Sequence, residues 1–171
     1  HINGEPSSKV RVPFRRRGMS AYVTEGIIDA AKEHDCQLVI RSFVNDLTHY
    51  MVAEKLADER VDGWIVMPGF SHEIEFIYAR LVENGLPIVF VDQYFASVPA
   101  DRVVTDNFTA ARDAVRYLVQ KGHRRIAYLT DYIPASSVID REAGYRAGLE
   151  EAGIPYDEEI VRSHEVMREY A

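Results

Sequence analysis

The stretch "VVTDNFTAARDAVRYLVQKGHRRIAYLTD" (103–131) predicts a strand–helix–strand unit whose first strand begins one residue earlier. A short strand is predicted over 102–106, and apolar residues at helical spacing predict a helix over about 109–120. Gly122 suits the left-handed end of that helix, and "RIAYLTD" (125–131) is an apolar run typical of a buried strand. Two strands joined by one helix through short connections are the building block of a parallel sheet.

Strand and helix patterns alternate along almost the whole chain. Short apolar runs bounded by turn residues separate stretches in which apolar residues recur at helical spacing. This alternation indicates an α/β fold with doubly wound parallel sheets and helices on both faces. The other predicted strands are 9–14, 36–43, 63–68, 87–92 and 158–163, and the other predicted helices are 21–34, 45–59, 71–85 and 140–152.

The composition is that of a globular protein with an acidic surface. Of the 171 residues, 47% are apolar and 27% are charged, and the net charge of −7 disfavours non-specific contact with nucleic acid. Cys36 is the only cysteine, so no disulfide forms within the chain. No apolar stretch approaches the roughly 20 residues of a membrane span. The polar start "HINGEPSS" (1–8) is interpreted as a linker or an expression remnant, and a cytoplasmic protein is expected, although a mature exported chain would also lack a signal.

Three basic residues, His123, Arg124 and Arg125, lie between the helix and the second strand of the opening stretch. They fit either a nucleic-acid patch or a solvated joint between helix and strand. Cations near a helix C-terminus interact favourably with the helix dipole, and the acidic net charge argues against nucleic acid. The joint is therefore the favoured interpretation.

In doubly wound sheets, ligands bind beyond the carboxyl ends of the strands, so candidate site residues are sought in the loops that follow strands. The first such loop carries Arg15–Arg17, which fit either an anionic or hydroxyl-rich ligand or a solvent-facing loop. Asp92 ends the strand predicted over 87–92, where a carboxylate either accepts hydrogen bonds from a polyol or amine ligand or caps a turn. Asp106 and Asn107 precede a predicted helix, which favours capping over ligand contact.

The last loop leads into the helix predicted over 140–152. Arg141 is placed in its first turn, where a cation opposes the helix dipole, so an arginine that reaches back over the cleft is of interest. Ser136 and Ser137 supply hydroxyls in the same loop. Asp140 either pairs with Arg141 or caps the helix.

The motifs of several enzyme classes are missing from the sequence. It contains no glycine-rich nucleotide loop, no GxSxG motif and no histidine pair at zinc-ligand spacing. The acidic pairs at 150–151 and 158–159 fall at a helix end and an exposed turn, where carboxylates are more often solvated than catalytic. An enzyme is not expected, and neither a cofactor nor a metal site is predicted.

Four segments carry a resemblance to a known family. They are "RVDGWIVMP" (60–68), "GLPIVFVDQ" (85–93), 103–131 and "SSVIDREAGYRAGLEEAGIPYDEEIV" (136–161). In their order and spacing they resemble the effector-binding domain of the sugar-responsive LacI/GalR bacterial transcription regulators. The most specific feature is an Asp-Asn pair that follows a strand and precedes a helix ending in Gly-His-Arg-Arg-Ile.

The resemblance implies a two-lobed, periplasmic-binding-protein-like fold of type I that closes on a sugar or a similar small molecule. The first lobe would be 9–106, and 107–171 would be part of the second lobe. A solute-binding protein of a sugar transport system is the alternative, because it has a similar fold. That alternative predicts an export signal, a monomer and no DNA-binding domain.

The resemblance also implies roles for single side chains. By matching positions, Asp92 resembles the carboxylate that holds ligand hydroxyls, and Gln93 is its neighbour in the cleft. Arg141 resembles the arginine that forks onto the ligand, and Ser137 matches a polar contact position. Asp106 matches a cleft position near the crossover between lobes. The complete candidate set is Asp92, Gln93, Arg141, Ser137, Asp106, Ser20 and Arg17.

The chain departs from the family pattern in three places. Met19 and Ser20 stand where the first loop of the family carries aromatic residues, so a more polar or anionic effector is conceivable. No helix-turn-helix precedes Lys9, and the family domain continues beyond "SHEVMREYA" (163–171), so truncation at both ends is expected. The expected partners are a sugar or sugar-derived effector, DNA through a separate domain such as a GntR-type winged helix, and a second copy in a homodimer.

Overall fold

The computed structural model describes residues 18–40, 61–68, 72–131, 133 and 135–164. The chain divides into two units, and the boundary lies between Val44 and Asn45. The described part of the first unit contains one helix, and the second unit contains helices of three to four turns and short strands.

The described part of the first unit contains α1 (Met19–Glu33), which confirms the helix predicted over 21–34. The helix ends where Asp35 adopts a positive φ of 52°, a conformation that Asp tolerates better than most residues. Residues 36–40 are not in a strand, so that part of the strand predicted over 36–43 is wrong, and its last three residues lie outside the described ones.

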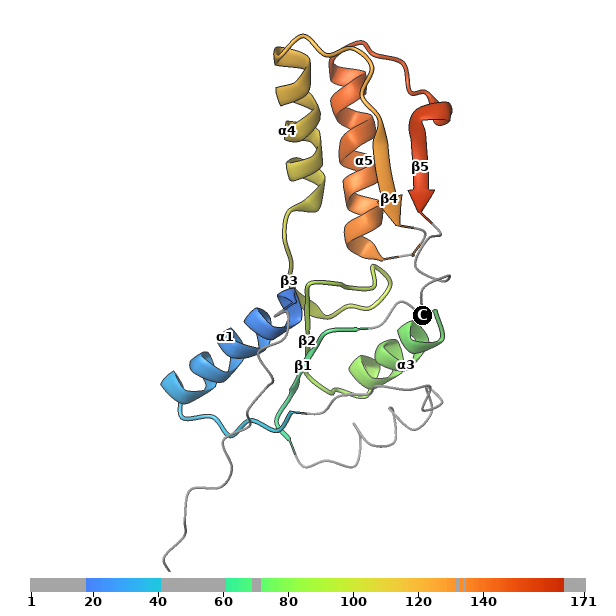
Figure 1. The fold of residues 1–171 in the computed structure, drawn as a ribbon. Helices are drawn as coiled ribbons and strands as arrows, with labels where there is room; N and C mark the ends of the chain where they lie inside the picture. The colour runs from blue at the N-terminus through green and yellow to red at the C-terminus, as the bar shows by residue number, and fades with distance from the viewer. Residues whose placement is uncertain (1–17, 41–60, 69–71, 132, 134, 165–171) are drawn as a thin grey trace, which may run out of the picture. The chain divides into compact units, whose positions relative to one another are not determined.

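The second unit contains a parallel sheet whose strand order is β1 (Trp64–Val66), β2 (Ile88–Val91) and β3 (Asp101–Val103). The helix α3 (His72–Glu83) connects β1 to β2 (Figure 1). Because the strands are parallel, their carboxyl ends meet at one edge of the sheet. The loop after β2, which carries Asp92, starts at this edge.

A second parallel pair follows in the same unit (Figure 1). The strands β4 (Tyr128–Asp131) and β5 (Val161–His164) pair with each other. The helix α5 (Ser136–Glu151) and the short 3₁₀-helix Glu158–Ile160 connect them. The helix α4 (Asn107–Gln120) precedes β4 and packs along α5. Parallel sheets with connecting helices confirm the predicted fold class.

Each sheet has its own hydrophobic core. In the first, Phe90 is 1% exposed and meets the ring of Tyr78 edge-on, with ring centroids 5.3 Å apart. Burial raises the pKa of Tyr78 to about 12. In the second core, the rings of Tyr145 and Tyr128 stack at 5.0 Å, and the Tyr145 hydroxyl donates to Ile126 O at 2.8 Å. This bond satisfies the hydroxyl that Tyr145 carries into the core.

The helices α3, α4 and α5 end as the sequence predicts. Gly85, Gly122 and Gly153 follow them with φ values of 85°, 92° and 65°. The next N–H then bonds back to the last turn, as when the His123 N–H donates to Leu118 O at 3.1 Å. A side chain at these glycines would strain the backbone, so the glycines fix where each helix stops.

Several predicted boundaries are wrong by two to four residues. The helix α4 begins two residues before the predicted start, and α5 begins four residues before it, at Ser136. The strand β4 begins at Tyr128, three residues late, because its partner β5 begins opposite that residue at Val161. A 3₁₀-turn occupies 158–160, where the last strand was predicted to begin.

Candidate functional site

Asp92 directly follows β2 and holds a strained backbone conformation. Its φ is 70°, and the Gln93 N–H donates to Val91 O at 2.9 Å, which closes a γ-turn of the rare positive-φ kind around Asp92. The Asp92 N–H stays in the sheet and donates to Val103 O at 3.1 Å. The residue is half-buried, and its carboxylate has no partner among the described residues. It is therefore available to accept hydrogen bonds from a ligand.

Gln93 caps a helix that begins more than forty residues later in the chain. The N-cap residue of α5 is Ala135, whose side chain accepts no hydrogen bond. Gln93 Oε1 supplies the missing acceptor for Ser136 Oγ (3.0 Å) and for the Ser137 N–H (3.3 Å). Gln93 Nε2 also donates to Ser137 Oγ at 2.7 Å. Three hydrogen bonds from one amide thus join the loop after β2 to the first turn of α5.

Tyr94 adds a second connection between the same two segments. Its N–H donates to Ser136 Oγ at 3.1 Å, and its hydroxyl donates to the Asp140 carboxylate at 3.3 Å. The Arg102 guanidinium lies 4.0 Å above the centre of its ring, at cation–π distance. Burial, and secondarily the charge of Asp140, raise the pKa of the Tyr94 hydroxyl. Asp140 lies in the second turn of α5, so its predicted role as a helix cap is wrong.

Arg141 also lies in the second turn of α5, because the helix begins at Ser136, and its predicted place in the first turn is wrong. Its Nη1 donates to Asn107 Oδ1 at 3.0 Å, and its Nη2 makes a longer contact of 3.5 Å with Ser137 Oγ. Asn107 is buried and donates to Thr105 O at 3.1 Å, so it is itself fixed. The guanidinium is held from two sides and keeps further N–H groups for a ligand.

Ser137 is 6% exposed, and its hydroxyl already contacts Gln93 and Arg141. The structure therefore joins three members of the predicted set in one hydrogen-bonded group, with Ser137 at its centre. Direct contact between any of these residues and a ligand stays a prediction.

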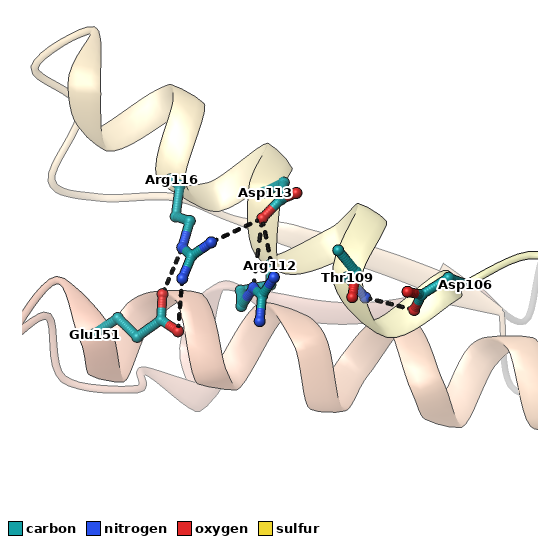
Figure 2. A network of polar contacts seen from close by, with 6 residues as sticks. All are labelled: Asp106, Thr109, Arg112, Asp113, Arg116 and Glu151. Atoms are coloured by element: carbon teal, nitrogen blue, oxygen red, sulfur yellow. Dashed lines mark hydrogen bonds and ion pairs between the residues drawn. The ribbon is translucent and has the colours of Figure 1, made fainter.

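Asp106 is the N-cap of α4, which confirms the capping interpretation. Its carboxylate accepts from the Thr109 N–H at 3.0 Å (Figure 2). This backbone donor lowers the pKa of the Asp106 carboxyl, because it stabilises the ionised form. The cap fixes the first turn of α4, in which Asn107 lies. A direct role for Asp106 in ligand binding stays a prediction.

A polar network further along ties α4 to α5. Arg116 forks onto Glu151 with bonds of 2.6 and 3.1 Å, and a third N–H donates to Asp113 at 3.1 Å (Figure 2). Arg112 lies beside Asp113 at 3.4 Å. These side chains have protein partners and lie largely at the surface, so the network serves the packing of the two helices.

The predicted set also includes Arg17 and Ser20. Arg17 lies outside the described residues, as do Arg15 and Arg16. Ser20 is an exposed residue of α1, in the other unit, and its carbonyl accepts from Thr24 Oγ1 at 2.8 Å. His123, Arg124 and Arg125 are exposed between α4 and β4, which agrees with a solvated joint.

A hollow of about 280 Å³ lies beside these contacts. Tyr94, Arg102, Asp106, Asn107 and Asp140 are among the residues that line it, whereas Asp92 and Arg141 are not. The candidate ligand site therefore rests on the gathered side chains and not on this hollow.

Two residues whose roles depend on distant contacts were not predicted from the sequence. Nothing in the local pattern marks Tyr94 as the partner of Asp140, or Arg102 as the cation above its ring. One usable signal was present, because Ala135 precedes a helix without any capping side chain. Such a helix needs a cap from elsewhere in the fold.

The described part of the chain shows neither a metal site nor a membrane-spanning helix. No group of three or more His, Cys, Asp or Glu side chains there is arranged to hold a metal ion. Each of its helices also falls short of the length and apolar character that a bilayer span requires.

A family model described as "Periplasmic binding proteins and sugar binding domain of LacI family" matches residues 8–169. The chain belongs to this family. The resemblance carried by the four sequence segments is thereby confirmed, and so is the periplasmic-binding-protein-like fold of type I.

Curated relatives of this LacI-family chain are named as transcriptional regulators. The "Probable HTH-type transcriptional regulator EndR" of Paenibacillus polymyxa is 30% identical over 154 residues, which are 85% of this chain and 44% of that protein. The "HTH-type transcriptional regulator CelR" of Thermobifida fusca is 30% identical over 144 residues, 82% of this chain and 42% of that protein. The chain spans less than half the length of these two relatives.

Solved structures agree with this assignment. The "transcriptional regulator CelR-cellobiose complex" matches with a TM-score of 0.71 and 28% identity, over 85% of this chain and 45% of that one. CcpA of Lactococcus lactis matches with a TM-score of 0.70 and 25% identity, over 84% and 53% of the two chains. GanP, a glucose-galactose binding protein from Geobacillus stearothermophilus, shares the fold at a TM-score of 0.62 and 24% identity, over 83% and 50%.

Proposed function

We propose that this LacI-family chain is the sugar-binding domain of a bacterial transcriptional regulator. The observation that carries the proposal is the group Gln93–Ser137–Arg141–Asn107, in which Gln93 directly follows Asp92, whose carboxylate has no partner among the described residues. A carboxylate and a guanidinium offer paired acceptors and donors, which suit the vicinal hydroxyls of a sugar. The role is binding rather than catalysis.

The effector class that fits best is a neutral sugar. The N-terminus of a helix attracts anions, but the Ser137 N–H of α5 is already taken by the neutral amide of Gln93. A phosphate at this position would have to displace that amide. The similar regulator CelR forms a complex with cellobiose, which is a neutral disaccharide.

Other parts of the proposal concern the whole regulator. The effector lies between a lobe of residues 9–106 and a second lobe that begins at 107. The protein acts in the cytoplasm as a homodimer and contacts DNA through a separate domain of helix-turn-helix or winged-helix type. The names of EndR and CelR as HTH-type regulators support the separate DNA-binding domain. The net charge of −7 also suits a domain that leaves DNA contact to another part of the protein.

A solute-binding protein of a transport system is the second candidate, because GanP shares the fold. The two candidates differ in assembly and in DNA binding. A monomer in light scattering, combined with no affinity of the full-length protein for DNA from its own promoter region, would favour the transport role.

A thermal-shift screen of the full-length gene product tests the proposal. Pentoses, hexoses and disaccharides are compared with sugar phosphates and sugar acids, for the wild type and for Asp92→Asn and Arg141→Lys. A neutral sugar is expected to raise the midpoint of the wild type and to have less effect on either variant. A response to phosphorylated or acidic sugars alone would contradict the neutral effector class. No response to any sugar would contradict the proposed function.

A further inference from the structure

Two glycines of α5 let this helix approach α4 unusually closely. A Cβ atom on Gly144 would lie 2.1 Å from the carbonyl oxygen of Phe108, and one on Gly148 would lie 2.7 Å from Val115 Cβ. Real Cβ atoms essentially never come within 3.0 Å of another heavy atom. An alanine at either position therefore forces the two helices apart around that position or distorts one of them there.

The first of these close contacts lies next to the side chains of the candidate site. Phe108 follows Asn107 in the first turn of α4, and Gly144 lies one turn after Arg141 in α5. Residues three apart on a helix share a face, so the Gly144 contact and the bond between Arg141 and Asn107 are neighbours along one helix seam. The second close contact, at Gly148, lies one further turn away from Arg141.

We propose that Gly144 and Asn107 are positioning residues for Arg141, an inference that rests on the sugar-binding function proposed above. Gly144 sets the distance between the two helices, and Asn107 accepts from the guanidinium that this distance brings within reach. Moving the helices apart until the 2.1 Å separation exceeds 3.0 Å would carry the 3.0 Å bond between Arg141 and Asn107 out of hydrogen-bonding range. The guanidinium would then be held only by its 3.5 Å contact with Ser137.

The consequence for binding follows from side-chain entropy. An arginine that is fixed before the ligand arrives loses less freedom on binding than a mobile one. Loss of the fixed position is expected to weaken sugar binding about tenfold. If Gly144 served only to pack the helices, alanine substitutions at Gly144 and Gly148 would have the same effect on Arg141.

The test compares Gly144→Ala with its matched control Gly148→Ala, and Asn107→Ala with Asn107→Asp, which keeps an acceptor oxygen. The first measurement is the ¹H–¹⁵N spectrum of the arginine guanidinium groups in the 171-residue chain without ligand. The signals of Arg141 are identified by their loss in Arg141→Lys. Separate Nη signals mark a guanidinium with restricted rotation, and averaged signals mark a free one.

Restricted signals are expected for the wild type, Gly148→Ala and Asn107→Asp, and averaged signals for Gly144→Ala and Asn107→Ala. The affinity for the neutral sugar found by the screen should fall about tenfold in Gly144→Ala and Asn107→Ala and change less than about twofold in Gly148→Ala. Averaged signals in the wild type, or equal effects of Gly144→Ala and Gly148→Ala, would overturn the inference. If Gly144→Ala does not fold, the guanidinium spectra of Asn107→Ala and Asn107→Asp test the inference.

The guanidinium spectra need no sugar, so they decide the positioning roles even if the screen finds no ligand. Failure of the proposed function and failure of this inference are therefore distinguishable. Restricted Arg141 signals with no sugar response would contradict only the function. Sugar binding that is unchanged in Asn107→Ala would contradict only the positioning role.

Discussion

Asp92 is the residue at which local strain and the candidate function coincide. Only Asp35 and Asp92 among the described non-glycine residues have positive φ values. Asp35 sits at a helix end, where such a conformation is common, whereas Asp92 is the centre of a γ-turn at the end of a buried strand. Strained residues of this kind cluster at ligand sites, because the surrounding fold must hold them in place.

Substitutions at Asp92 should distinguish the effect of its backbone conformation on stability from the effect of its carboxylate. Asp92→Asn is expected to fold as stably as the wild type, since Asn tolerates positive φ, while Asp92→Ala should lose about 1 kcal/mol. Asp92→Gly should be more stable than Asp92→Ala, because Gly adopts positive φ without strain. Urea unfolding of the three variants measures this order. Equal stability of the alanine and glycine variants would show that the turn is not strained.

At the scale of single elements, α5 depends on a cap that its own sequence does not provide. Ala135 occupies the N-cap position, and Gln93 supplies the acceptor from the loop after β2. This explains the largest error in the predicted boundaries. Asp140 looked like the natural cap, so the helix was predicted to begin four residues too late.

Removing the Gln93 amide should uncap α5. Gln93→Ala is expected to destabilise the chain by about 1–2 kcal/mol and to speed hydrogen exchange at the Ser137 amide. Gln93→Glu keeps an acceptor oxygen, and a negative charge is favourable at a helix N-terminus, so this variant should retain the protection. Hydrogen exchange followed by mass spectrometry, with α4 as the internal reference, measures the protection of the Ser137 amide in both variants. Unchanged exchange at Ser137 in Gln93→Ala would contradict the capping role.

The elements that the sequence predicted well are those whose signals are local. The glycine stops of α3, α4 and α5 and the Asp106 cap of α4 depend on neighbouring residues, and the structure confirms them. The start of β4 depends on where β5 begins, and the cap of α5 depends on Gln93, so neither is visible in a local pattern. The same holds for the site. Asp92 and Arg141 were identifiable by position and resemblance, but the bond between Arg141 and Asn107 needs the approach of two helices.

At the scale of the whole molecule, family membership and one hydrogen-bonded group point to the same role. Residues 8–169 match the sugar-binding domain of the LacI family, and relatives at 30% identity are named as transcriptional regulators. Within the second unit, the loop after β2 and the first turns of α4 and α5 contribute side chains to the group that contains Arg141. Together these observations support the proposal that the chain recognises a sugar and leaves DNA contact to another part of the protein.

Asp92 and Arg141 are proposed to hold a neutral sugar. Isothermal titration calorimetry measures the affinity for this sugar directly. The sugar that gives the largest thermal shift is titrated into the wild type and into Asp92→Asn, whose backbone tolerates the same turn. Losing a hydrogen bond to a charged group costs about 2 kcal/mol, so we predict roughly thirtyfold weaker binding by the variant. Equal affinity of the two proteins would contradict the proposal, because the charged carboxylate would then contribute nothing to sugar binding.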